Sequence, residues 1–283
     1  MIRGSENEGL LSHSSHNILS QPASLKHSNS IWAFIQRIFS CGPESGHSPL
    51  SRTSLESFYQ LSAFAAEDFD ANDSAHVRRF DLLLRLVFPE DAEKCPSVLE
   101  NALWPTLGFQ TEKAYTDLRS GGILALDVLI KLAYSRPRIV QDALDFSRRR
   151  GNFLFACSVI SATLFLKQFF HFGLLKSKVT MITTKKVASK RCLVYFLALM
   201  DPSSSSEEKR ESFLELIEVY SVKIFEYWKQ EDSKKQLNIA QYNQLEKTFE
   251  LKFSKEIESL ARKSIRPKNF EDFIAAIEGI QFK

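Results

Sequence analysis

Hydrophobic residues recur at intervals of three and four from about residue 53 to the end of the chain, the spacing of one face of an α-helix. The segment 205–231 shows this pattern most clearly, and Ser205 and Glu208 predict a capping box at its start. Its expected core-facing stripe consists of Phe213, Leu216, Ile217, Tyr220, Ile224, Tyr227 and Trp228. Alternating polar and apolar residues suggest a strand only at 178–184, "KVTMITT", and there weakly. We therefore predict an all-α fold, with a single multi-helix domain over residues 51–283.

Cap and turn residues predict where the helices begin and end. Thr53 and Glu56 form an expected capping box for the helix "SLESFYQLSAFAAEDF". Residues 72–74, Asn-Asp-Ser, offer an N-cap for "AHVRRFDLLLRLVF", which Pro89 should end, and Ser97 can start a short segment toward Trp104. Later helices are expected at 117–134, 138–150, 152–175, 188–200, 205–231, 239–263 and 268–280.

The N-terminal 50 residues differ in composition from the rest of the chain. Residues 1 to about 30 are rich in Ser, Asn, His and Gln without apolar periodicity, which predicts a disordered tail. Within 31–39, "IWAFIQRIF" has apolar residues at helical spacing, and the following "CGPESGHSP" cannot continue a helix. This short amphipathic helix can dock on its own domain, the favoured interpretation, or on a partner or a membrane surface.

The longest uncharged stretch, "FLFACSVISATLFL" at 153–166, raises the alternative of a membrane-spanning helix. A bilayer requires about 20 apolar residues. Extending the stretch to Leu175 would bring Lys167, Gln168 and His171 into the hydrocarbon, which is costly. The favoured interpretation is a central helix wrapped by its neighbours. Hydroxyl side chains that can bond to the carbonyl one turn earlier are Ser158, Ser161 and Thr163.

Composition and motifs exclude several functional classes. A net charge of +3 on 283 residues does not indicate a nucleic-acid partner. The four cysteines lie far apart, which suits reduced thiols in the cytoplasm. The chain lacks a glycine-rich phosphate loop, HExxH, GxSxG and paired CxxC motifs. His13 and His16 would bind a metal only with ligands from elsewhere. We therefore expect no metal site, no cofactor and no self-contained enzyme centre.

The densest candidate for function is residues 103–133, "LWPTLGFQTEKAYTDLRSGGILALDVLIKLA". Gly108 and Gly122 mark positions where backbone geometry or close approach matters. Asp117, or Thr116, is expected to cap the first turn of the helix 117–134. Arg119 then falls in that first turn, where the helix dipole disfavours a cation. It should therefore be compensated by an internal carboxylate or by an incoming anion.

This segment resembles the signature of the ELMO (engulfment and cell motility) domain. The matching residues are Trp104, Gly108, Phe109, Gln110, Thr116, Asp117, Arg119, Gly122, Leu124, Leu126 and Leu129. "FDLLLRLVFPE", "FLFACSVISATLFLKQFF" and the late Trp228 extend the resemblance over about 74–231. It departs at Ala114, Leu118 and Ser120, where the family favours proline, phenylalanine and glycine, which predicts a less rigid loop before the arginine.

The resemblance implies an activity. Family members that keep the arginine are similar to GTPase-activating proteins for Arf and Arf-like small GTPases, and the motif arginine corresponds to Arg119. Arg119 would be catalytic, supplied in trans, while magnesium and nucleotide belong to the GTPase. Gln110 is expected to bond the loop backbone, and Asp117 to cap the helix and set the angle of the arginine. The other residues expected at the GTPase interface or supporting the motif are Trp104, Gly108, Phe109, Thr116 and Gly122.

Three alternatives stay open at this point. Arg119 can instead form a buried pair with a carboxylate and stabilise the loop. The chain can be a non-catalytic scaffold in small-GTPase or cytoskeletal signalling complexes. It can also be an adaptor at a membrane surface, through the Trp32 region or the basic stretch 167–191, which has seven Lys or Arg and no acidic residue. The expected location is cytoplasmic, at the periphery of membranes in this last case.

Overall fold

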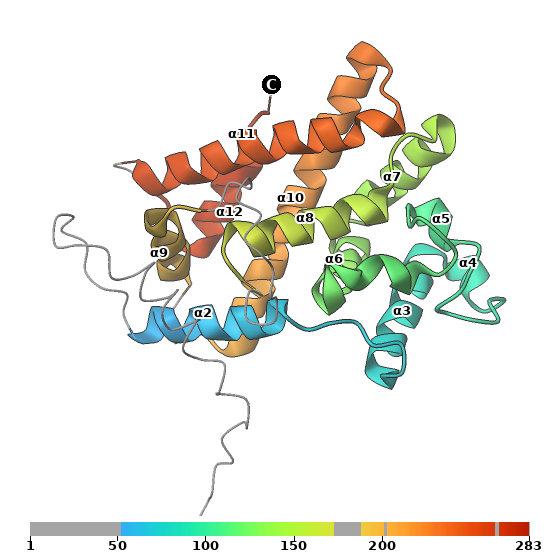
Figure 1. Cartoon of the computed structure of the whole chain (residues 1–283), viewed down its shortest axis with the longest axis horizontal. Helices are drawn as coiled ribbons and strands as arrows, with labels where there is room; N and C mark the ends of the chain where they lie inside the picture. The colour runs from blue at the N-terminus through green and yellow to red at the C-terminus, as the bar shows by residue number, and fades with distance from the viewer. Residues whose placement is uncertain (1–51, 173–187, 201–202, 264–265, 283) are drawn as a thin grey trace, which may run out of the picture. The chain divides into compact units, whose positions relative to one another are not determined.

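The computed structural model describes residues 52–172, 188–200, 203–263 and 266–282, and this part of the chain contains helices and no strand (Figure 1). The all-α prediction is confirmed there. The predicted tail, the amphipathic helix at 31–39, the weak strand at 178–184 and most of the basic stretch 167–191 lie outside the described residues. In that described part, no helix combines the length and the apolarity needed to cross a membrane.

The helices follow one another with short connections. Their bounds are α2 Arg52–Ala65, α3 Ser74–Val87, α4 Pro89–Ala92, α5 Trp104–Leu107, 3₁₀ helix η2 Ala114–Arg119, α6 Gly122–Ser135, α7 Pro137–Arg150, α8 Phe155–Phe169, α9 Lys190–Leu199, α10 Ser206–Lys235, 3₁₀ helix η3 Ile239–Gln241, α11 Tyr242–Arg262 and α12 Phe270–Glu278.

Helix α10 is the longest described helix, with 30 residues, and packs against α2, α6, α8, α11 and α12 (Figure 1). The predicted capping box is present: the Ser205 hydroxyl accepts from the Glu208 backbone N–H, and the Glu208 carboxylate accepts from the Ser205 N–H. Every residue of the predicted core-facing stripe is buried. The hydrophobic pattern therefore identified the face on which much of the core is built.

Helix α8 is the central helix expected from its uncharged sequence. Ten of its 15 residues are buried, and it packs against α6, α7 and α10. Thr163 donates to the carbonyl of Val159 at 2.8 Å, as predicted for a buried hydroxyl in a helix. Burial among neighbouring helices thus accounts for the apolar sequence.

Local cap predictions had mixed outcomes. Asp73 is the N-cap of α3, and its carboxylate accepts from the Ala75 N–H at 2.7 Å. The capping box at Thr53 is wrong, because α2 already includes Arg52 and Thr53 is inside the helix. The single helix expected at 117–134 is also wrong. Residues 114–119 form the separate helix η2, and α6 starts only at Gly122.

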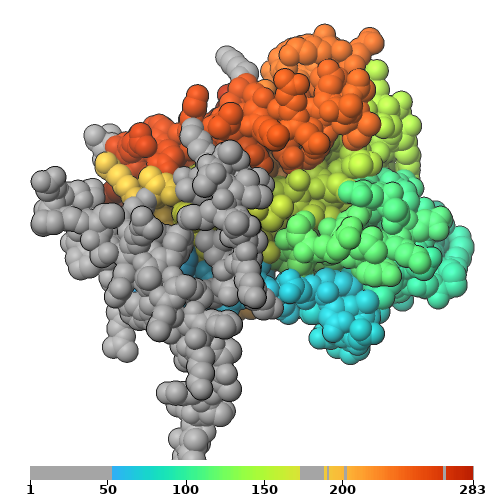
Figure 2. All heavy atoms as spheres, viewed as in Figure 1, coloured from blue at the N-terminus to red at the C-terminus, as the bar shows by residue number. Residues whose placement is uncertain are grey.

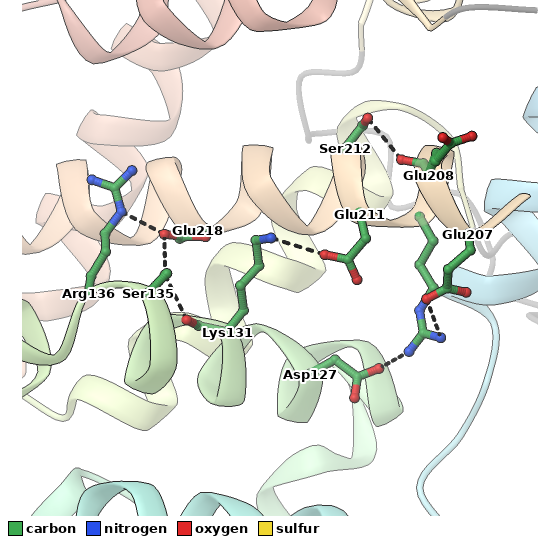
Figure 3. A network of polar contacts seen from close by, with 10 residues as sticks. Asp127, Lys131, Ser135, Arg136, Glu207, Glu208, Glu211, Ser212 and Glu218 are labelled. Carbon is green, nitrogen blue, oxygen red and sulfur yellow. Dashed lines mark hydrogen bonds and ion pairs between the residues drawn. The ribbon is translucent and has the colours of Figure 1, made fainter. Parts of the chain in front are cut away.

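A polar seam joins α6 to α10 (Figure 3). Lys131 bonds Glu211 at 3.0 Å, and Asp127 pairs with Arg210. At the end of α6, Ser135 and Arg136 both donate to Glu218, whose side chain is only 4% exposed. Arg136 also pairs with Glu278 of α12 at 2.6 Å. The seam fixes α6 against α10. It therefore also fixes the segment that precedes α6.

Candidate functional site

Two aromatic residues of the motif anchor it in the core. Trp104 is fully buried, and its indole N–H donates to the carbonyl of Val98 at 2.8 Å. Phe109 is 1% exposed. The rings of Trp104 and Phe109 lie 5.6 Å apart, and both contact Phe80 of α3. Neither side chain is accessible to a partner, so both support the motif from within the core.

Gly108 allows the motif to pack against the start of α8. It ends α5 with a φ of +97°, a backbone conformation that favours glycine. A Cβ at this position would lie 2.2 Å from the backbone nitrogen of Phe155. The carbonyl of Gly108 accepts the N–H of Cys157 at 3.1 Å. Any side chain here would push the motif off α8.

Gly122 makes a comparable approach on the other side of the motif. Its φ is +67°, and a Cβ would lie 2.2 Å from the carbonyl oxygen of Glu67. The same carbonyl accepts the N–H of Ile123 at 3.2 Å. The chain after α2 therefore packs against the first turn of α6. In the sequence, this turn follows η2, the helix that carries Arg119. Glu67 was not among the predicted site residues, because its contribution comes from the main chain.

Asp117 does not cap α6, contrary to the prediction. The N-cap of α6 is Gly121, and no side chain bonds there. Instead, Asp117 Oδ2 accepts the backbone N–H of Gln110 at 2.7 Å. Gln110 thus bonds to the motif through its main chain. Thr116 is not a cap either, because its hydroxyl donates to the carbonyl of Lys113 at 2.8 Å. The prediction failed because it assumed one continuous helix from residue 117.

Cys157 lies against the carboxylate of Asp117 and was missed by sequence analysis. Its Sγ is 3.9 Å from Asp117 Oδ2. Burial, reinforced by the negative charge of Asp117, raises the pKa of the Cys157 thiol to about 12. A thiol held protonated is a weak nucleophile. Cys157 therefore serves the site as a neutral neighbour of Asp117.

Arg119 is exposed at the C-terminal end of η2. Its Nε donates to the carbonyl of Thr116 at 2.7 Å, and no carboxylate of the described residues lies within 4.0 Å of the guanidinium. The alternative of a buried ion pair is therefore not found in this part of the chain. The predicted position in the first turn of α6 is wrong, because η2 ends at Arg119. A cation is favourable at that end of a helix.

The three departures from the family pattern have simple local explanations. Ala114 and Leu118, four residues apart in η2, are 0% and 1% exposed and attach η2 to the core. Ser120 has φ −100° and ψ −35°, which any residue can adopt, so glycine is not required there.

A hollow of about 350 Å³ opens beside η2. Its motif side consists of Gln110, Asp117 and Ser120, and residues of α8, η3 and α11 complete it. Figure 2 shows this face, with the yellow-green surface of α8 between the green motif segment and the orange start of α11. Ile239, on the α11 side, is 46% exposed. The hollow therefore borders the segment that carries Arg119.

The described residues contain no group of three or more His, Cys, Asp or Glu side chains that could hold a metal ion. His13 and His16 lie outside the described residues.

Comparison with known proteins gives one family match. A family model described as ELMO/CED-12 matches residues 59–246, which is more than half of the chain and includes the whole motif. No curated protein and no solved structure matches the chain.

Proposed function

This chain belongs to the ELMO/CED-12 family, and from that premise we propose that it is a GTPase-activating protein for an Arf or Arf-like small GTPase. In this proposal Arg119 is supplied in trans and contacts the nucleotide bound to the partner. Magnesium and GTP belong to the GTPase, so the chain itself requires no cofactor.

The observation that carries the proposal is the state of Arg119. Its guanidinium is exposed, is attached to its own helix through Nε alone, and has no carboxylate partner among the described residues. An arginine that only stabilised the fold would be expected to pair with a carboxylate, as Arg136 does with Glu218 and Glu278. The two terminal nitrogens of Arg119 have no hydrogen bond to a described residue and are available as donors to an anion.

The chemistry of phosphoryl transfer explains why an arginine suits this position. In the transition state of GTP hydrolysis, negative charge spreads over the oxygens of the transferring phosphoryl group. A guanidinium supplied by a partner protein neutralises that charge and accelerates hydrolysis by about 10³–10⁵-fold. This corresponds to about 4–7 kcal/mol of barrier. The planar guanidinium contacts two oxygens at once, which an ammonium cannot do with the same geometry.

A non-catalytic scaffold is the second candidate. The departures at Ala114, Leu118 and Ser120 motivate it, because they lie in the segment that presents Arg119. Under this proposal the chain binds a small GTPase or a cytoskeletal signalling complex through the same surface without accelerating hydrolysis.

A GTP-hydrolysis assay with a panel of Arf and Arf-like GTPases tests both candidates. The wild-type chain should accelerate hydrolysis by at least one of them, and Arg119→Lys should lose about 10³-fold or more of that acceleration. Arg262→Lys, at an exposed arginine on α11 outside the motif, is the matched control and should retain it. Binding of a GTPase by the wild-type chain without any acceleration would exclude the activator and support the scaffold.

A further inference from the structure

Helix η2 is attached to the domain by buried apolar side chains and by the carboxylate of Asp117, which also lies 3.9 Å from Cys157 Sγ of α8. The side chains of Ala114 and Leu118 are buried in the core. The second contact is the hydrogen bond from the Gln110 N–H to Asp117 Oδ2, at 2.7 Å, which we name the Asp117–Gln110 clamp. It joins the turn after Gly108 to the middle of η2, across seven positions of sequence.

From this arrangement we infer that Asp117 is a positioning residue for Arg119, acting through the clamp to fix the direction of the guanidinium. The inference rests on the proposed function for its catalytic meaning, but the geometry that it invokes belongs to the free protein.

The path from Asp117 to the guanidinium is short and rigid. Arg119 Nε is bonded to the carbonyl of Thr116, the residue next to Asp117 in η2. In a 3₁₀ helix, residues three apart lie one above the other, so Thr116 and Arg119 share one side of η2. The direction of the guanidinium therefore follows the orientation of the η2 backbone. Whatever sets that orientation also sets where Nη1 and Nη2 point.

The buried side chains alone leave that orientation incompletely defined. Ala114 and Leu118 hold η2 to the core through apolar contacts, which are non-directional. The last turn of η2, with its Thr116–Arg119 bond, can therefore loosen and move the exposed Arg119 while both side chains stay buried. A hydrogen bond to a charged acceptor is directional and short, and the clamp opposes this loosening.

Lys167 also contacts this segment without replacing the clamp. Its Nζ lies 3.4 Å from the carbonyl of Gly121 and 3.5 Å from that of Ser120. These contacts are longer than the clamp, and the two carbonyl groups that they reach come after Arg119 in the chain. They steady the junction to α6, whereas Asp117 lies within η2 itself.

The test compares Asp117→Ala with Asp117→Asn in the full chain, and uses Asp81→Ala as the matched control. An asparagine oxygen can still accept the Gln110 N–H, whereas alanine cannot. Asp81 is an aspartate on α3 that pairs with Arg85, outside the motif. The first measurement is solvent exchange of the Arg119 Nε–H by NMR, which reports the bond to Thr116 without any GTPase.

The second measurement is the GTP-hydrolysis assay with this protein at a concentration that saturates the GTPase. We expect Asp117→Ala to accelerate exchange of the Arg119 Nε–H and to lower the maximal stimulated rate by about 10²-fold, the effect of a displaced catalytic group. The half-saturating concentration should stay unchanged. Asp117→Asn should restore most of both properties, and Asp81→Ala should resemble wild type.

Two results would overturn the inference. One is unchanged Arg119 Nε–H exchange in Asp117→Ala. The other is a raised half-saturating concentration with an unchanged maximal rate, which would make Asp117 a contact to the partner. If Asp117→Ala does not fold, Asp117→Glu moves the acceptor by one methylene and gives the same comparison. If wild type activates no GTPase, the proposed function fails, and the NMR exchange alone still decides the positioning role.

Discussion

The carbonyl oxygen of Glu67 occupies the place where a side chain at Gly122 would begin, 2.2 Å from a Cβ built on that glycine. The same oxygen accepts the N–H of Ile123 at 3.2 Å. Glu67 and Gly122 lie 55 positions apart in sequence. Their contact fixes the start of α6, which comes shortly after Arg119 in the chain. Glycine at position 122 is thus a packing requirement as well as a conformational one.

Replacing Gly122 by alanine should lower the free energy of unfolding by about 3 kcal/mol or more. A positive φ costs an alanine about 1–2 kcal/mol, and the clash with Glu67 adds a cost like that of overpacking. Gly151→Ala is the matched control, because Gly151 has φ +65° but nothing within 4 Å of its Cβ. It should lose only about 1 kcal/mol. Urea unfolding of both variants measures the difference, and equal losses would show that the Glu67 contact is not rigid.

Two arginines should respond differently to truncation. Arg136→Ala leaves the buried carboxylate of Glu218 without its cationic partner and should cost roughly 3 kcal/mol of unfolding free energy. Arg119→Ala removes an exposed side chain with no described carboxylate partner and should change it by less than about 0.5 kcal/mol. Chemical denaturation of the two variants side by side checks this contrast. A large loss for Arg119→Ala would mean that this arginine supports the fold.

Cys157 should react slowly with iodoacetamide near pH 8. With the pKa of its thiol raised to about 12 by burial and by the charge of Asp117, only about 10⁻⁴ of it is thiolate at that pH. Asp117→Asn removes the negative charge, lowers the pKa and should increase the rate of alkylation. Mass spectrometry of the Cys157 peptide over time gives both rates. An unchanged rate in Asp117→Asn would show that burial alone controls the thiol.

The N-cap of α3 should contribute a pH-dependent part of the stability. The hydrogen bond from the Ala75 N–H holds the pKa of Asp73 below its ordinary value. A lowered pKa in the folded state stabilises the protein above the unfolded pKa, and this stabilisation is lost as the pH falls through the folded pKa.

Asp73→Asn keeps an N-cap acceptor without the charge, so it isolates this effect. Wild type should be more stable than Asp73→Asn near pH 7, and the difference should shrink as the pH falls below about 4. Thermal unfolding of both chains across this range measures it. A difference that is independent of pH would show that the charge of Asp73 plays no part.

Much of the fold was predictable because its signals are local. The apolar stripe of α10 and the capping box at Ser205 lie within a few turns of one helix, and a hydrophobic stripe reports its own burial. The N-cap at Asp73 was predictable for the same reason. The break between Arg119 and Gly122 was missed, because two adjacent glycines in a helical pattern do not reveal which conformation the surrounding chain imposes on them.

For the candidate site, the sequence by itself determined which segment carries the family motif and that Arg119 is its one arginine. Only the tertiary structure decided that Arg119 is exposed, that Asp117 bonds Gln110, and that Cys157 and Glu67 belong beside the motif. The physical reason is the range of the interactions. Periodicity and caps depend on neighbours within a few residues, whereas these contacts join segments that meet only when α2, α6 and α8 have packed.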